Sequence, residues 1–186
     1  MNLPNKLTLL RVFLVPFFMF FMLTDIVPYS PIFALAIFVL ASITDALDGH
    51  IARSQNLITT FGKFLDPLAD KVLVVAALTC LCQMGIVGAV PLIIIISREF
   101  MVSGLRLCTA NEGVVVAAGI WGKLKTAFTM IAIVVILLGL CFTFSDSMAK
   151  IADIVYQILI WISTALTVIS GGVYLKGYWK YIDSSK

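Results

Sequence analysis

The chain has 186 residues, of which 61% are hydrophobic and only 12% are charged, and its formal net charge is +3. This composition lies well outside that of a soluble domain and is typical of a membrane protein. The small net charge gives no support for nucleic-acid binding, and the length predicts one domain, residues 1–186, built from helices that each need about 20 apolar residues to cross a bilayer.

Six apolar segments follow one another along the chain, separated by short breaks. They cover residues 7–24, 31–53, 64–84, 90–110, 120–143 and 151–176. Because a backbone that spans a bilayer must satisfy its own hydrogen bonds, all six segments are predicted to be helices. The sequence therefore predicts an all-α integral membrane protein with six transmembrane helices.

Basic residues gather on one side of these predicted spans. Of the 13 Lys and Arg residues, only Lys150 falls in the breaks near residues 25–30, 84–90 and 144–150. The positive-inside rule then predicts that both termini face the cytoplasm. Aromatic residues near the C-terminus fit a belt at that membrane surface. They are Tyr174, Tyr178, Trp179 and Tyr181.

Four aspartates fall where lipid should exclude charge. The phrases DALDGHIAR and GKFLDPLAD contain Asp45, Asp48, Asp66 and Asp70 at spacings of three and four. Such spacings place each pair on one helix face, and the helical rise of about 1.5 Å per residue brings both pairs to the same depth if the two helices are antiparallel. We therefore expect the four carboxylates to form one site, embedded near the cytoplasmic face of the membrane.

Four converging carboxylates need protons or cations to offset their repulsion. Mg²⁺ and Mn²⁺ prefer carboxylate oxygens and keep coordination positions open for water and phosphate. Two such ions, bridged by shared carboxylates, would stabilise the attacking and leaving oxygens of a phosphoryl displacement. The alternative is a cation or proton transporter whose aspartates relay ions, but transport would not require the glycines and arginine that lie at fixed offsets in the motif.

The motif resembles a known signature. DxxDGxxAR(x8)GxxxDxxxD, which fills 26 residues here, is the pattern of the CDP-alcohol phosphotransferase family. Within that family, LPNKLTLLR, SREFMVSGLR and GKLKT resemble bacterial members whose acceptor is glycerol 3-phosphate. The resemblance implies an enzyme of the bacterial cytoplasmic membrane that transfers the phosphatidyl group from CDP-diacylglycerol to sn-glycerol 3-phosphate and releases CMP. A phosphatidylserine, phosphatidylinositol phosphate or cardiolipin synthase remains an alternative, because acceptor choice lies outside the Asp motif.

The family pattern also implies roles for single residues. Two divalent ions would be bound by Asp45, Asp48, Asp66 and Asp70, and Asp70 would also be the general base. The CDP-binding residues would be Asn5, Gly49, Ala52, Arg53, Thr59 and Gly62. Homodimers are common in the family, and the small residues Thr167, Gly171 and Gly172 would allow the close helix contact that a dimer needs.

Basic residues beyond the Asp motif are candidates to bind the acceptor phosphate. Arg98 and Arg106 lie eight residues apart in the fourth segment, nearly on one helix face, and Lys123 begins the fifth. We expect these three residues to form the acceptor phosphate site. The alternatives are an ion pair of the arginines with Glu99 and, for Lys123 or Lys125, anchoring at the membrane surface.

Overall fold

The computed structural model describes the backbone of residues 3–24, 26–54, 60–110 and 119–182, and the side chains of residues 8–24, 26–44, 69, 71–106 and 119–179. All regular secondary structure in these ranges is helical. The helices are α1 (Leu3–Leu23), α2 (Ser30–Ser54), α3 (Thr60–Gln83), α4 (Ala89–Ala110), α5 (Ile120–Leu140) and α6 (Asp146–Ile182). Their number and order confirm the six predicted helical segments.

The largest differences from the predicted boundaries occur at α6, and α1 and α3 each begin four residues earlier than predicted. Helix α1 begins at Leu3 with Pro4 in its first turn, where the missing proline N–H is not needed for an intrahelical bond. Helix α6 has 37 residues and so extends for about 55 Å. It begins at Asp146, ahead of the predicted apolar segment, and this acidic residue in the first turn interacts favourably with the helix dipole.

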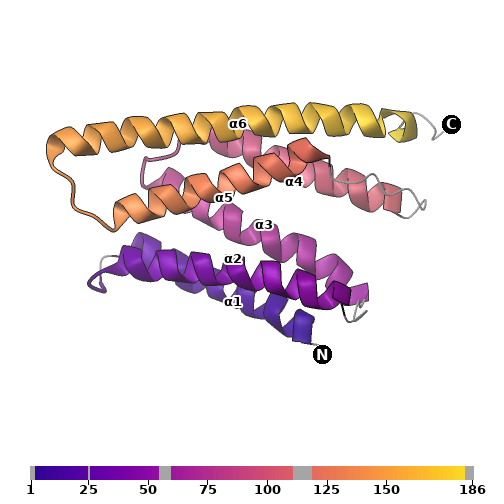
Figure 1. The fold of residues 1–186 in the computed structure, drawn as a ribbon, viewed down its shortest axis with the longest axis horizontal. Helices are drawn as coiled ribbons and strands as arrows, with labels where there is room; N and C mark the ends of the chain where they lie inside the picture. The colour runs from indigo at the N-terminus through magenta and orange to yellow at the C-terminus, as the bar shows by residue number, and fades with distance from the viewer. Residues whose placement is uncertain (1–2, 25, 55–59, 111–118, 183–186) are drawn as a thin grey trace.

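The helices run up and down, so that consecutive connections lie at opposite ends of the bundle (Figure 1). Both chain termini lie at the end where α2 is followed by α3 and α4 by α5. This arrangement agrees with the prediction that the two termini lie on one side. That this side faces the cytoplasm stays a prediction from the distribution of basic residues.

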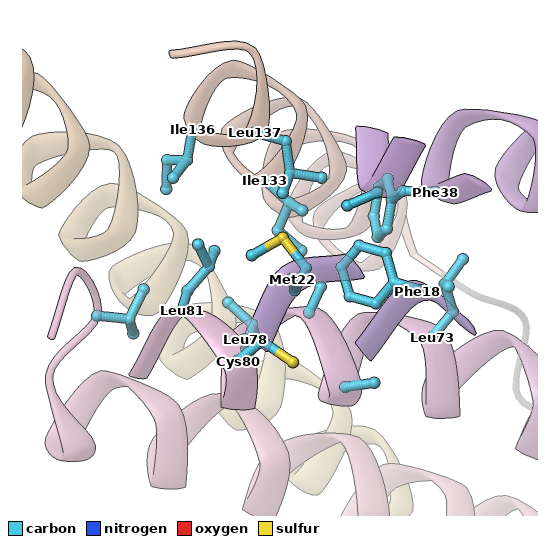
Figure 2. Packing of buried hydrophobic residues seen from close by; sticks show 14 of the residues in the cluster. Phe18, Met22, Phe38, Leu73, Leu78, Cys80, Leu81, Ile133, Ile136 and Leu137 are labelled. Carbon is cyan, nitrogen blue, oxygen red and sulfur yellow. The ribbon is translucent and has the colours of Figure 1, made fainter. Parts of the chain in front are cut away.

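The hydrophobic core joins helices from both halves of the chain. In Figure 2, Phe18 of α1 and Phe38 of α2 face each other, and their ring centroids lie 5.9 Å apart. Leu78 of α3 and Ile133 of α5 belong to the same buried cluster. The core therefore holds α1, α2 and α3 together as a unit, with α5 packed against it.

Large apolar side chains cover the outside of the bundle. Phe13, Ile131, Ile154 and Trp161, which come from three helices, are each more than half exposed. Apolar surface of this kind indicates contact with lipid or with another protein. The exterior therefore fits a bundle that is embedded in a membrane.

Length and hydropathy identify two helical stretches, among the residues that the structure describes, that could cross a membrane. They are Ile120–Leu140 and Asp146–Trp179. Shorter apolar helical stretches are Thr8–Leu23, Ser30–Thr44 and Lys71–Gln83. Composition thus supports spanning most directly for α5 and α6.

Helix α3 ends in a glycine turn that directs the chain back into α4. Gly85 has a φ of 78°, a conformation that side chains with a Cβ rarely adopt. The N–H of Ile86 donates to the Leu81 carbonyl at 2.9 Å, and the N–H of Gly85 donates to the Cys82 carbonyl at 3.0 Å. This pair of bonds is a Schellman motif, which caps the final carbonyls of α3.

Small residues let α5 and α6 approach closely. Thr129 of α5 and Ser163 of α6 share a hydrogen bond of 2.6 Å between their hydroxyl oxygens. Farther along, the buried Tyr156 ring packs onto Gly139 so tightly that a Cβ at position 139 would lie 1.6 Å from the tyrosine Oη and 2.7 Å from its Cζ. The contact therefore depends on glycine.

Gly139→Ala should destabilise the protein by up to about 2 kcal/mol. Moving the rigid Tyr156 ring out of a packed site costs about 1–3 kcal/mol, and the gain of about 1 kcal/mol that alanine brings to a helix offsets part of that cost. Thermal unfolding in detergent measures the effect. Gly172→Ala is the matched control, since a Cβ there meets nothing within 4 Å. Equal stability of the two variants would contradict the packing argument, whereas recovery in a Gly139→Ala/Tyr156→Leu double variant would support it.

The three small residues that were expected to allow dimer contact differ in their surroundings. Thr167 is fully buried and its hydroxyl donates to the Ser163 carbonyl at 2.7 Å. Gly171 is buried against α4, where a Cβ would lie 3.2 Å from Cγ of Arg98. Gly172 is exposed. Two of the three therefore serve packing within the chain, and the homodimer stays a prediction.

Candidate active site

The Asp motif lies on two consecutive helices that meet at one end of the bundle. Asp45 and Asp48 belong to α2, and Asp66 and Asp70 belong to α3. Asp48 comes six residues before the end of α2, and Asp66 six residues after the start of α3. Because the two helices are antiparallel (Figure 1), these positions lie at one level, about 9 Å from the helix ends. The backbone thus permits the predicted convergence, while the four side chains lie outside the described ones.

Five of the six predicted CDP-binding residues lie on helices at the same end of the bundle. Asn5 lies in α1, Gly49, Ala52 and Arg53 lie in α2, and Gly62 lies in α3. Thr59 lies outside the described residues, as do the side chains of the other five. Their roles stay predictions.

Arg11 is a buried cation that the sequence analysis did not assign to the site. Its side chain lies on the inner face of α1 and is only 1% exposed. The Phe18–Phe38 contact sets the register of the antiparallel α1–α2 pair. Arg11 comes seven residues before Phe18 in α1, and Asp45 comes seven residues after Phe38 in α2. Each position is about 10 Å from that contact along its helix, so the two lie at one level. Helix register therefore brings a positive charge to the depth of the acidic motif.

A cavity of about 1160 Å³ opens between α3, α4 and α5, with contributions from α1 and α6. Its described lining includes five basic residues and one acidic residue. They are Lys71, Arg98, Arg106, Lys123, Lys125 and Glu99. Other parts of the wall are apolar and include Val15, Leu78 and Ile95. The cavity thus combines a strongly basic region with an apolar one, which suits an anionic ligand that also carries hydrocarbon.

Arg98 is held by groups on two helices. One guanidinium nitrogen, Nη2, donates to the Ser170 hydroxyl of α6 at 2.6 Å, and the other, Nη1, lies 3.2 Å from Oε1 of Glu99. Nε of Arg98 is buried and donates no hydrogen bond within the described part of the chain. The guanidinium is therefore fixed in place by contacts from both of its terminal nitrogens.

Glu99 links the two predicted basic segments. Its Oε1 accepts hydrogen bonds from Arg98 and from Lys125, so one carboxylate oxygen joins α4 to α5. Lys125 is 3% exposed, whereas Lys123 is exposed and lines the cavity. The ion pair considered as an alternative for Arg98 is therefore present. The two lysines of GKLKT differ accordingly: Lys125 is paired in the bundle, and Lys123 is available to a ligand.

Two tyrosines near the C-terminus are buried, and their expected place in an aromatic belt is wrong. Tyr174 is 6% exposed and Tyr178 is 1% exposed, and their rings stack with an interplanar angle of 14°. Trp179, which is 67% exposed, does face outward as expected. A spacing of four puts both tyrosines on one face of α6 together with Ser170, and burial in the structure shows that this face is the inner one.

The matching family model is that of CDP-alcohol phosphatidyltransferases, and it covers residues 1–169. The chain belongs to the CDP-alcohol phosphatidyltransferase family. It is accordingly an enzyme of a membrane-bound family, which agrees with its apolar helices. The family match includes all four helices that contribute Asp45, Asp70, Arg98 and Lys123.

Several relatives are similar to this chain over nearly its whole length. The CDP-diacylglycerol–glycerol-3-phosphate 3-phosphatidyltransferase of Bacillus subtilis is 41% identical, covering 99% of this chain and 98% of its own. Proteins of the same name from Rickettsia bellii and Haemophilus influenzae are each 40% identical. They cover 97% and 94% of this chain and 97% and 92% of their own length.

The cavity reaches the residue that follows the Asp motif in sequence. Lys71 lines the cavity, and it directly follows Asp70 on α3. The basic wall formed by Arg98, Arg106 and Lys123 therefore belongs to the same cavity as Lys71, the residue that follows the motif. An anion bound at these residues would be held beside the helix that carries the predicted general base.

Proposed function

We propose that this enzyme transfers the phosphatidyl group of CDP-diacylglycerol to sn-glycerol 3-phosphate, yielding phosphatidylglycerophosphate and CMP. The product belongs to phosphatidylglycerol and cardiolipin biosynthesis. The names of the relatives support the reaction, and the observation that carries the acceptor is the basic cavity beside Asp70. Phosphate of a small alcohol is a dianion, and a wall with several arginines and lysines offsets that charge.

The donor set on α2 and α3 fits a divalent metal centre. Asp45, Asp48, Asp66 and Asp70 offer only carboxylate oxygens, at matching levels of two antiparallel helices. Hard cations such as Mg²⁺ and Mn²⁺ prefer such donors. Two of these ions, held by the four aspartates, would offset the negative charge of the pyrophosphate and of the departing CMP.

The chain's own residues then position the reactants and move one proton. Asn5, Gly49, Ala52, Arg53, Thr59 and Gly62 hold the CDP part of the donor. The acceptor hydroxyl attacks the phosphorus that bears diacylglycerol, and the bond from that phosphorus to the CMP oxygen breaks. The Asp70 carboxylate takes the hydroxyl proton during the attack.

The acceptor phosphate binds to Arg98, Arg106 and Lys123 in this proposal. Arg98 is held at Ser170 and Glu99 in a fixed geometry, so little of its side-chain entropy remains to be lost on binding. Arg106 and Lys123 line the same cavity. With the phosphate held there, the free hydroxyl of the acceptor is directed toward α3 and Asp70.

We also propose how the enzyme sits in its membrane. One domain, residues 1–186, crosses the bacterial cytoplasmic membrane six times, with the termini and the active site facing the cytoplasm. The support is that both termini lie at the end of the bundle where α2 meets α3, and that basic residues gather there. A homodimer is the expected assembly.

An acceptor panel tests the function. Purified protein in detergent with CDP-diacylglycerol and Mg²⁺ should release CMP with sn-glycerol 3-phosphate, and at least about tenfold more slowly with serine, inositol phosphate or phosphatidylglycerol. Serine and phosphatidylglycerol present no phosphate dianion to the basic wall, and inositol phosphate carries its dianion on a larger ring. Addition of EDTA should stop release, and excess Mg²⁺ or Mn²⁺ should restore it.

Each other outcome of the panel has a definite meaning. Faster release with serine, inositol phosphate or phosphatidylglycerol would assign the chain to another acceptor class within the family. Release that survives EDTA would reject the metal centre. Absence of CMP with every acceptor, from protein that is folded in detergent, would reject the transferase.

A further inference from the structure

Tyr174 lies where three helices meet at the basic wall of the cavity. It belongs to α6, is 6% exposed, and lines the cavity together with Arg98 and Arg106 of α4. The Arg98 Cζ lies 5.3 Å from the centroid of the Tyr174 ring, and the Arg106 Cζ lies 5.7 Å from the same centroid. One ring thus contacts both arginines that are proposed to bind the acceptor.

Two guanidinium groups that share a ring need a reason to stay together, because like charges repel. The negative face of an aromatic ring attracts cations within about 6 Å of its centroid, and this attraction is stronger where water is excluded. Both arginine contacts fall within that distance. The ring therefore offsets part of the repulsion and favours an arrangement in which both arginines line one cavity.

The ring itself is fixed by its neighbours. A Cβ added at Gly122 of α5 would lie 3.1 Å from the Tyr174 Oη and 3.2 Å from its Cε2, so the glycine makes room for the ring edge. Tyr178 stacks on the ring at a centroid distance of 6.3 Å. Gly171, one turn before Tyr174, makes room for the Arg98 stem in the same way. The ring and the Arg98 stem are therefore held by specific packing contacts with these neighbours.

We infer that Tyr174 is a positioning residue for the acceptor: its ring holds Arg98 and Arg106 in the arrangement that receives the acceptor phosphate. This inference rests on the proposed acceptor site. Tyr174 is not required to touch substrate, and it lies on α6, outside the helices that carry the Asp motif. Its effect should therefore fall on acceptor binding rather than on the donor or on proton transfer.

The test compares Tyr174→Leu with Tyr174→Phe. Tyr174→Leu should raise the KM for sn-glycerol 3-phosphate by about 5- to 30-fold, the amount expected from losing partly desolvated cation–π contacts. The KM for CDP-diacylglycerol should change by less than about twofold. Tyr174→Phe keeps the ring face and should remain within about twofold of the wild-type value for both substrates. Trp179→Leu, which removes an exposed aromatic ring from the same helix, is the matched control.

Two further measurements distinguish the positioning role of Tyr174 from a general structural role. In a Tyr174→Leu/Arg106→Ala double variant the rise in acceptor KM should be smaller than the product of the two single rises, because part of the effect of Tyr174 passes through Arg106. If Tyr174→Leu does not fold in detergent, pentafluorophenylalanine at position 174 keeps the ring shape while removing its negative face, and should give the same acceptor-specific rise.

The KM values distinguish failure of this inference from failure of the proposed acceptor site. If Tyr174→Leu or the fluorinated ring leaves the acceptor KM unchanged while Arg106→Ala raises it, the acceptor site stands and Tyr174 has no positioning role. Equal rises for both substrates, or strictly multiplicative effects with Arg106→Ala, would also overturn the inference. If neither the arginine variants nor the Tyr174 variants affect the acceptor KM, the acceptor site itself is wrong.

Discussion

Asp70→Asn should reduce the rate of CMP release by at least about 100-fold and up to about 10,000-fold, the range that a positioned general base contributes. Asparagine has nearly the same shape as aspartate but cannot take the proton of the acceptor hydroxyl. The residue directly precedes Lys71, which lines the cavity, so an acceptor held there is close to position 70. The measurement is the rate of CMP release at saturating concentrations of both substrates.

A measurement of CDP-diacylglycerol binding distinguishes loss of the general base from loss of the whole active site. Retention of labelled CDP-diacylglycerol by solubilised Asp70→Asn protein should stay within about threefold of the wild type, since three other aspartates remain. Asp153→Asn, at an exposed position in α6, is the matched control and should leave the rate unchanged. A variant at position 70 that keeps more than a tenth of the wild-type rate would remove Asp70 from the role of base.

Arg106→Ala should raise the KM for sn-glycerol 3-phosphate by about 10- to 100-fold, because a hydrogen bond between charged groups contributes about 1.5–3 kcal/mol. The KM for CDP-diacylglycerol should rise by less than about threefold. Arg106 is preferable to Arg98 for this test, because Arg98 also joins α4 to Ser170 of α6 and its loss would disturb packing. Initial rates of CMP release with each substrate varied in turn give both constants.

Two substitutions control the Arg106 experiment. Arg106→Lys keeps the charge but loses the forked guanidinium, so its acceptor KM should lie between those of the wild type and of Arg106→Ala. Lys150→Ala removes a basic residue from the opposite end of the bundle and should change neither constant. Similar increases in both constants for Arg106→Ala would mean that the residue supports the whole site rather than the acceptor.

The fold was largely predictable because its signals are local. Apolar segments separated by breaks predicted six helices in the right order, and errors of four or more residues occurred at helix ends such as Leu3 and Asp146. Those ends depend on Pro4 in a first turn and on Asp146 at a helix N-terminus, which are compatible with a helix but do not by themselves require one. Hydropathy records which residues avoid water, and it sets helix ends only approximately.

The sequence by itself determined the spacing of Asp45, Asp48, Asp66 and Asp70, and with it the family and the predicted donor chemistry, because spacings of three and four on a helix fix a shared face without any other part of the chain. Only the tertiary structure decided the partners of the basic residues. The lysine of α5 that pairs with Glu99 of α4 is Lys125 rather than Lys123. Tyr174 turns inward to contact arginines of α4 rather than outward to the membrane surface. The reason is physical: the side of a helix that faces a neighbour depends on how helices distant in sequence pack, and no local pattern records it.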